Sequence, residues 1–282
     1  MALYTLKELL ADAQGRRYGV GFFNTHNQEM LLACIEAAEE RRSPVVVGTA
    51  ESLLRYSDFD TIAPMMLEAA RRAKVPVAVH LDHSYSFECI MRALRWGFGS
   101  VMYDGSRSTY EENVRVSANI AQAAHAMGVG LECELGCVGG LAEGFADGDN
   151  RVDENVYTDP DMSASFVELT GADFLAVSIG TVHGVYKSEP RLDLERLAEI
   201  RKRVDVPLVL HGGSGLSEGD FRAVIAGGIV KVNIYTDVIT AGKKALAENL
   251  GKGYSDMLEA SKNAMREVVT AYLDIFGSTG KA

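Results

Sequence analysis

The sequence predicts an α/β fold, a TIM-type (β/α)8 barrel with extra helices at its C-terminal end. Eight short apolar runs alternate along the chain with amphipathic segments. The length of 282 residues suits one large barrel. No linker rich in Pro, Gly or Ser divides the sequence, so we expect residues 1–282 to form a single domain.

The eight apolar runs are up to eight residues long and rich in β-branched residues. They cover residues 18–24, 43–48, 75–80, 100–105, 129–135, 173–180, 206–213 and 229–235. Strands this apolar are typical of a parallel sheet that is buried on both faces. Each run is therefore expected to be a barrel strand.

The segments between the runs carry apolar residues at helical spacing, for example 29–42, 87–97, 110–128 and 192–204. Eight strand–helix units fit a barrel better than a doubly wound sheet. Two segments exceed a minimal barrel. Residues 136–157 are rich in Gly and Asp and are predicted to form a mobile lid loop, and residues 239–276 are predicted to form a C-terminal helical extension.

Composition limits the classes of function. With 28 Lys+Arg against 39 Asp+Glu, the net charge of -11 argues against a nucleic-acid-binding surface. No run of eighteen apolar residues predicts a membrane span, and the first residues lack the pattern of a cleaved signal, so we expect a cytoplasmic protein. The four cysteines are scattered and are expected to be reduced thiols.

Polar residues gather where the predicted strands end, which is the face that carries catalysis in this fold. They are Asn24, His80, Asp82, His83, Asp104, Ser106, Glu134, His183, His211 and Asn233. Four of the six histidines of the chain belong to this set. We interpret the remaining two, His26 and His125, as structural or surface residues.

His83, His183 and His211 come from three different strand ends and are candidate ligands of a catalytic zinc ion. The alternative is that each is a hydrogen-bonded loop histidine. Asp82 precedes His83 and is the candidate catalytic acid or base, or else a residue that orients a metal ligand. Asp104 and Glu134 form an alternative cation site or are hydrogen-bond partners of the rim. Glu132 shares strand parity with Glu134 and can be a polar residue of the barrel interior.

The segment from His211 to Gly215 follows a strand and precedes a helical pattern, so its backbone N–H groups can hold a phosphate. Asn233, Tyr235 and Thr236 follow the next strand, and the loops after the last two strands are the recurrent phosphate site of this fold. The candidate substrate-binding residues are Asn24, Gly184, Gly212, Gly213, Ser214, Asn233, Tyr235 and Thr236.

With these residues assembled, the chain resembles the class II, zinc-dependent ketose-bisphosphate aldolases, which include fructose- and tagatose-bisphosphate aldolases. The matching stretches are 80–88, 100–113, 132–140, 157–160, 179–190, 207–215 and 231–237. The resemblance implies Zn²⁺ on the three histidines and Asp82 as the acid/base at the C4 hydroxyl. It also implies a monovalent cation, Na⁺ or K⁺, near the phosphate, and Gly184, Ser214, Asn233 and Thr236 around dihydroxyacetone phosphate.

Three departures from the family pattern concern the active site. Ser84 stands where relatives have a small residue after the first zinc histidine. In the lid the family commonly places Glu two residues after the paired glycines, where this chain has Ala142 followed by Glu143. Glu143 is the candidate for the proton at C3; the alternative is that this role is vacant. Gly253-Tyr254-Ser255 replaces an Asp-Pro-Arg turn that would reach a distal phosphate, for which Arg107, Lys187, or Lys262 and Arg266 of a neighbouring subunit are substitutes.

The expected reaction is reversible cleavage of a ketose 1,6-bisphosphate, or a related ketose 1-phosphate, into dihydroxyacetone phosphate and an aldehyde. The partner is then a small sugar phosphate, and the protein is expected to be a homodimer or homotetramer. The alternatives are another acceptor aldehyde, a zinc hydrolase on the same barrel, a non-enzymatic metal-dependent scaffold, and an imine-forming Lys231.

Overall fold

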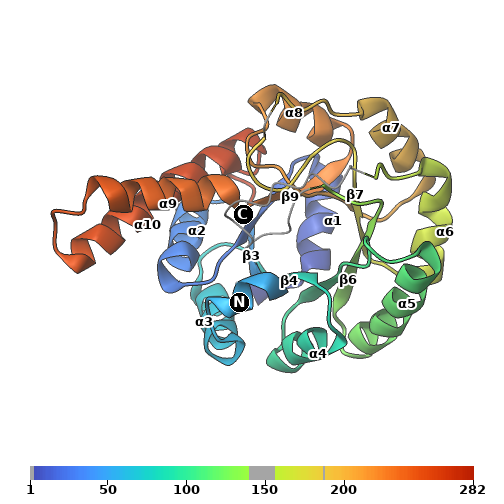
Figure 1. Ribbon diagram of the computed structural model, residues 1–282, viewed down its shortest axis with the longest axis horizontal. Helices are drawn as coiled ribbons and strands as arrows, with labels where there is room; N and C mark the ends of the chain where they lie inside the picture. The colour runs from blue at the N-terminus through green and yellow to red at the C-terminus, as the bar shows by residue number, and fades with distance from the viewer. Residues whose placement is uncertain (1–2, 140–155, 187) are drawn as a thin grey trace.

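In the computed structural model, which describes residues 3–139, 156–186 and 188–282, eight parallel strands close into a barrel surrounded by helices (Figure 1). The strands are β2 (Val20–Asn24), β3 (Val45–Ala50), β4 (Val77–Ser84), β5 (Ser100–Tyr103), β6 (Gly130–Leu135), β7 (Phe174–Val177), β8 (Leu208–Leu210) and β9 (Ile229–Ile234). Pairing of β2 with β9 and of β4 with β5 completes the ring. The predicted TIM barrel and all eight predicted strands are confirmed.

Helices follow the strands in the predicted alternation. They are α2 (Gln28–Arg41), η1 (Glu51–Arg55), α3 (Phe59–Arg72), α4 (Phe87–Trp96), α5 (Tyr110–Ala126), α6 (Pro160–Thr170), α7 (Leu194–Arg203) and α8 (Glu218–Ala226). Most begin after a polar residue whose side chain accepts a backbone N–H of the first turn, such as Asn27, Ser86 and Thr109. These caps define where each strand-to-helix connection ends.

A short strand and a helix precede the barrel. β1 (Leu3–Tyr4) pairs with the beginning of β4, and α1 (Leu6–Arg16) packs its apolar face across the N-terminal end of the barrel. Leu6 and Leu10 are fully buried there in one cluster with Phe22 and Phe174 of the barrel interior. The N-terminal end of the barrel is thus closed by hydrophobic packing.

The C-terminal helical region consists of α9 (Thr236–Glu248) and α10 (Tyr254–Ile275). It begins three residues before the predicted start at 239, directly after β9. α10 packs against both α9 and α2, and the two C-terminal helices project from the side of the barrel as a hairpin, drawn in orange and red in Figure 1. Gly242 permits this close packing, because a Cβ atom at this position would lie 2.9 Å from Ser261 Oγ.

The barrel interior changes from apolar to polar along the strands. Val46, Ala78 and Val209 belong to the apolar cluster near α1. Asp82, Glu132, His211, Lys231 and Asn233 are buried farther along their strands. Buried polar groups cost free energy unless they are paired, so this end of the barrel is the part to examine for a site.

Two further sequence predictions concern the cysteines and membrane spans. The four cysteines are free, and three of them are buried. No helix among the described residues combines the length and the apolar character that crossing a membrane requires.

Candidate active site

An irregularity at the end of β4 brings Asp82 and His83 into the same site. Adjacent strand residues normally point to opposite faces. Here the pairing of β4 with β5 shifts register between Leu81 and Ser84, and His83 has a positive φ of 32°, an uncommon conformation for a residue other than glycine. As a result both side chains contact residues at the carboxyl end of the barrel.

The structure brings the three predicted zinc ligands together. The ring centroids are 4.5 Å apart for His83 and His211, 4.9 Å for His83 and His183, and 6.0 Å for His183 and His211. One nitrogen from each ring can be chosen so that all three lie within 4.8 Å of one another. His83 and His211 are buried, and His183 lies on the loop after β7.

Carboxylates fix the orientation of two of these rings. Asp104 Oδ2 lies 2.8 Å from Nδ1 of His83, and Glu132 Oε1 lies 2.8 Å from Nε2 of His211. The remaining nitrogens, Nε2 of His83 and Nδ1 of His211, face each other at 2.7 Å. Two neutral rings held in this way would direct lone pairs at each other, so a proton or a metal ion is required between them.

The protonation of the rings agrees with that requirement. Burial opposes a charge on His83, but the carboxylates of Asp82 and Asp104 outweigh it and raise the pKa of His83 to about 10. Burial, together with the charge on His83, lowers the pKa of His183 and of His211 well below the ordinary value. His183 and His211 are therefore neutral imidazoles, which is the form that binds metals.

The residues present fit a zinc ion. Both ring nitrogens of His183 are buried and have no hydrogen-bond partner among the described residues. Buried polar atoms are rarely left unpaired. Coordination of a cation would account for one of these two nitrogens. Three imidazoles, two of them backed by carboxylates, are the donor set of a catalytic zinc site.

Asp82 lies next to this cluster and is held by two amides. Nδ2 of Asn24 donates to Oδ2 of Asp82 at 2.9 Å, and Nδ2 of Asn233 donates to Oδ1 at 3.0 Å. The carboxyl group is completely buried, and burial raises the pKa of Asp82 despite the opposing charge of His83. A buried carboxylate with a raised pKa is suited to accepting and returning a proton.

A buried ion pair lies beneath the histidines, and the sequence did not predict it. Nζ of Lys231 is 2.9 Å from Oε2 and 3.2 Å from Oε1 of Glu132, and both side chains are fully buried. Glu132 is an interior residue, as its strand parity indicated. Its Oε1 also forms a hydrogen bond with Nε2 of His211. The amine of Lys231 is engaged with a carboxylate, which argues against its role as an imine-forming nucleophile.

Asp104 and Glu134 occupy the other side of His83. Their carboxylates and His83 form a second group able to hold a cation. Burial and the nearby charge of Asp104 raise the pKa of Glu134 to about 8. Burial of Asp104 is outweighed by the hydrogen bond and charge of His83, which lower the pKa of Asp104. Ser106 also donates to Asp104, at 2.6 Å.

The glycine-rich loop after β8 adopts conformations that need glycine. Gly212 has φ 66°, and a Cβ atom there would lie 2.5 Å from the carbonyl oxygen of Val182. Ser214 Oγ accepts backbone N–H groups of Tyr235 and Asp237 at 3.3 and 3.4 Å. The loop therefore meets the N-terminus of α9, whereas α8 begins only at Glu218 behind its own cap, Ser217.

At the mouth of the barrel, three aromatic rings from separate loops pack together, a contact that the sequence did not reveal. His26, interpreted above as structural or surface, is half-buried, and its ring centroid lies 5.6 Å from Tyr56 and 6.2 Å from Tyr235. His125 is distant from this mouth and hydrogen-bonds Asp173 on the other end of the barrel. The spacing of residues along one strand carries no signal for a contact among three loops.

Ser84 has a role in holding the loop after β4. Its Oγ donates to Oε2 of Glu51 at 2.8 Å, and the same carboxylate accepts the backbone N–H groups of Tyr85 and Ser86. Burial of Glu51 is outweighed by these hydrogen bonds, which lower its pKa. The hydroxyl group of Ser84 is thus hydrogen-bonded to Glu51, the first residue of η1.

The predicted lid is described only at its base. Cys137 and Val156 exchange backbone hydrogen bonds, and the N–H of His183 donates to the carbonyl oxygen of Gly139 at 2.8 Å. The base of segment 136–157 is thus attached beside a candidate zinc ligand. Glu143 and the rest of residues 140–155 lie outside the described residues.

A closed (β/α)8 barrel with three histidines and a buried aspartate at the carboxyl ends of its strands has the arrangement of a TIM-barrel enzyme with a candidate metal site. A family model described as "Fructose-bisphosphate aldolase class-II" matches residues 4–281. The chain therefore belongs to the class II fructose-bisphosphate aldolase family, and it is an aldolase, a carbon–carbon lyase.

Several relatives match over almost the whole chain. A fructose-bisphosphate aldolase of Thermus caldophilus is 41% identical over 99% of this chain and 100% of its own length. The Escherichia coli protein YdjI is 40% identical over 96% of each chain. The crystal structure of this YdjI aldolase superposes with a TM-score of 0.88 at 36% identity over 99% of both chains. A putative fructose-1,6-bisphosphate aldolase of Coccidioides immitis gives a TM-score of 0.92 at 34% identity over 98% of this chain and 97% of its own.

Proposed function

We propose that this aldolase cleaves a ketose 1,6-bisphosphate of the fructose or tagatose type, or a related ketose 1-phosphate, into dihydroxyacetone phosphate and an aldehyde, with zinc as cofactor. One observation carries the proposal: His83, His183 and His211 converge beside the buried carboxylate of Asp82. Relatives named as fructose-bisphosphate aldolases support the substrate class.

His83, His183 and His211 would hold the zinc ion. When bound, zinc would supply Lewis-acid stabilisation of the negative charge that develops on the ketose oxygens. Asp104 and Glu132 orient the rings of His83 and His211, so that the protein does not reorganise as this charge appears. An imine is not needed for such a reaction.

Asp82 would take the proton from the C4 hydroxyl during cleavage and return it during condensation. Asn24 and Asn233 each donate one N–H to its carboxylate, which leaves further lone pairs for a substrate hydroxyl. These amides fix the carboxyl group without neutralising it. The geometry therefore favours a positioned acid/base.

The phosphate of dihydroxyacetone phosphate would bind where the loop after β8 meets α9. Gly212 and Ser214 would present backbone N–H groups, whereas the N–H of Gly213 donates to the carbonyl oxygen of Asn233 at 3.2 Å. The first turn of α9 at Thr236 adds the positive end of a helix dipole. Gly184 also has a positive φ, of 90°, on the loop that carries His183. The monovalent cation expected near this phosphate stays a prediction.

The acceptor end of the substrate would depend on Arg107. The 253–255 turn lies at the tip of the projecting α9–α10 hairpin, away from the barrel mouth (Figure 1). Lys262 and Arg266 are engaged with Glu36 of the same chain. Arg107 acts electrostatically on both Tyr85 and His183, so its charge lies at the rim of the site. We propose Arg107 as the group that recognises a distal phosphate or another anionic substituent.

Membership of the aldolase family favours this reading over a zinc hydrolase or a non-enzymatic scaffold. The decisive experiment measures cleavage of fructose 1,6-bisphosphate, tagatose 1,6-bisphosphate and fructose 1-phosphate, with and without a chelator, and after borohydride treatment in the presence of substrate. Activity should vanish with the chelator, return with zinc and resist borohydride. Inactivation by borohydride with indifference to chelators would overturn the proposal. A homodimer or homotetramer remains the expected assembly.

A further inference from the structure

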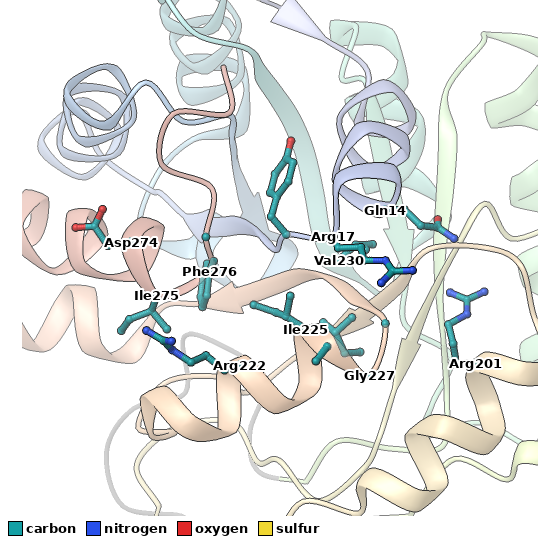
Figure 2. A pocket seen from close by; sticks show the side chains of 15 residues that line it. Gln14, Arg17, Arg201, Arg222, Ile225, Gly227, Val230, Asp274, Ile275 and Phe276 are labelled. Atoms are coloured by element: carbon teal, nitrogen blue, oxygen red, sulfur yellow. The ribbon is translucent and has the colours of Figure 1, made fainter.

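A pocket lies at the opposite end of the barrel from the histidine cluster. It has a volume of about 820 Å³, and its walls include the ends of α1, α8 and α10 and the beginning of β9 (Figure 2). Pockets of a few hundred to about 1,000 Å³ are the size that holds small metabolites. The two sites lie at opposite ends of the barrel strands. β2, from Val20 to Asn24, spans roughly 13 Å at about 3.3 Å per residue, and this length is the approximate separation of the two sites.

Three arginines and one aspartate are the charged groups that line this pocket. Arg17 and Arg201 lie on one side of it in Figure 2, near Gln14, and Arg222 and Asp274 lie on the other. Arg222 pairs with Glu218, and Asp274 pairs with Arg41 at 3.1 Å. Arg17 and Arg201 are then the two lining cations for which the described part of the chain offers no direct ion pair.

Neither of the two remaining arginines has a carboxylate partner among the described residues. Arg201 donates to the backbone carbonyl oxygens of Val204 and Val206, which uses two of its five N–H donors. Burial lowers the pKa of Arg201, and the nearby charge of Asp205 opposes this shift. Arg17 is exposed at the end of α1. Two guanidinium groups that lack a direct carboxylate partner among the described residues are unexpected in one cavity of a chain with a net charge of -11.

The backbone is shaped to keep Arg201 at the pocket. Gly228 has φ 107°, and a Cβ atom at this position would lie 2.7 Å from Cδ of Arg201. Glycine therefore lets the arginine side chain lie against the turn between α8 and β9. Several other lining residues are apolar or aromatic, among them Tyr18, Ile225 and Phe276, which suits the carbon skeleton of a ligand.

We propose that this pocket binds a small phosphorylated metabolite, with Arg17 and Arg201 holding its phosphoryl group. Guanidinium groups match phosphate oxygens with paired, charge-assisted hydrogen bonds. The bound ligand would contact Ile229 and Val230, the residues that precede Lys231 on β9. This site is separate from the phosphate site proposed above and does not depend on it.

The test follows backbone hydrogen exchange of the full-length, zinc-loaded protein during titration with inorganic phosphate, against sodium chloride at equal ionic strength. Phosphate should slow exchange in residues 226–230 and 274–277. Arg17→Ala should weaken this protection by about tenfold or more, as for loss of hydrogen bonds to a charged group. Lys202→Ala removes a positive charge at the next position of α7, from a residue that pairs with Glu199 and does not line the pocket, and it should leave the protection unchanged.

Arg201→Lys provides a second variant, because it keeps the charge while losing the planar fork, and it should also weaken protection of these segments. Residues 212–215 and 235–237 report the active-site phosphate and should respond equally in wild type and in Arg17→Ala. Absence of protection at 226–230 in the wild type, or equal phosphate affinity in Arg17→Ala and Lys202→Ala, would overturn the proposal while leaving the proposed function untouched.

Discussion

Glu132 joins a buried lysine to a candidate zinc ligand. Its Oε2 lies 2.9 Å from Nζ of Lys231, and its Oε1 lies 2.8 Å from Nε2 of His211. All three side chains are fully buried. The carboxylate accepts a hydrogen bond from Nε2 of His211, which holds the Nε2–H tautomer, so that Nδ1 faces His83.

Glu132→Gln should therefore weaken zinc binding by about 10- to 100-fold, the usual effect of losing a carboxylate behind a ligating histidine. Competition with a chromophoric chelator measures this affinity. Glu112→Gln, in an exposed pair with Arg115, serves as the control and should bind zinc like the wild type. Unchanged zinc affinity in Glu132→Gln would mean that the carboxylate only balances Lys231.

The same ion pair predicts a stability effect. Glu132→Gln and Lys231→Met each leave one buried charge unpaired and should lower the free energy of unfolding by about 3–5 kcal/mol. The double variant leaves no charge and should lose much less than the sum of the two single changes. Denaturant unfolding of the zinc-free proteins gives these values. Additive losses would show that the two groups do not interact.

Asp82 and His211 should fail in different ways. Asp82→Asn keeps the size of the side chain and should retain zinc, but turnover should fall by about 10²-fold or more because the acid/base is lost. His211→Ala should lose zinc first. Metal content and kcat of the two purified proteins separate these roles. Loss of zinc from a folded Asp82→Asn would identify Asp82 as a residue that orients the metal ligands.

The barrel could be predicted from the sequence because its strands are buried on both faces and therefore form continuous apolar runs. The polar residues that end these runs gave most of the site, since all carboxyl ends of a closed parallel barrel meet on one face. His83, His183 and His211 could be grouped as candidate zinc ligands from this shared face.

Other features depend on contacts that no local pattern encodes. Asp82 and His83 have opposite strand parity, and only the irregular pairing of β4 with β5 lets both reach the site. The partner of Glu132 is 99 residues away on another strand. Arg17 and Arg201 meet at the pocket from α1 and α7. Periodicity reports which face is buried but not which distant side chains become neighbours.

Gly212 offers a test of the phosphate loop with a matched control. Gly212→Ala combines a positive φ with a clash against the carbonyl oxygen of Val182, so the loop must shift. We expect the KM for dihydroxyacetone phosphate in the condensation reaction to rise by about tenfold or more, as for lost charge-assisted hydrogen bonds. Gly219→Ala adds a methyl group in the first turn of α8, where the nearest atom is 3.6 Å away. Its KM should stay at the wild-type value.

The position of Arg107 leads to a prediction about recognition of the acceptor end of the substrate. Burial and the charge of His83 lower the pKa of His183, and Arg107 adds to this effect from the rim of the site. A guanidinium group there can form paired bonds to a distal phosphate, each of which contributes about 1.5–3 kcal/mol. Arg107→Ala should therefore lower kcat/KM for fructose 1,6-bisphosphate by about 10- to 100-fold and leave that for fructose 1-phosphate within about twofold.

Arg107→Lys separates charge from shape in the same measurement. If paired bonds matter, lysine should recover only part of the preference for the bisphosphate, because an ammonium group lacks the planar fork of arginine. Arg115→Ala, a charge change on the exposed face of α5, should behave like the wild type toward both substrates. Equal losses for the bisphosphate and the monophosphate in Arg107→Ala would place the arginine's effect on the shared half of the substrate, and the distal end would then be recognised by another group.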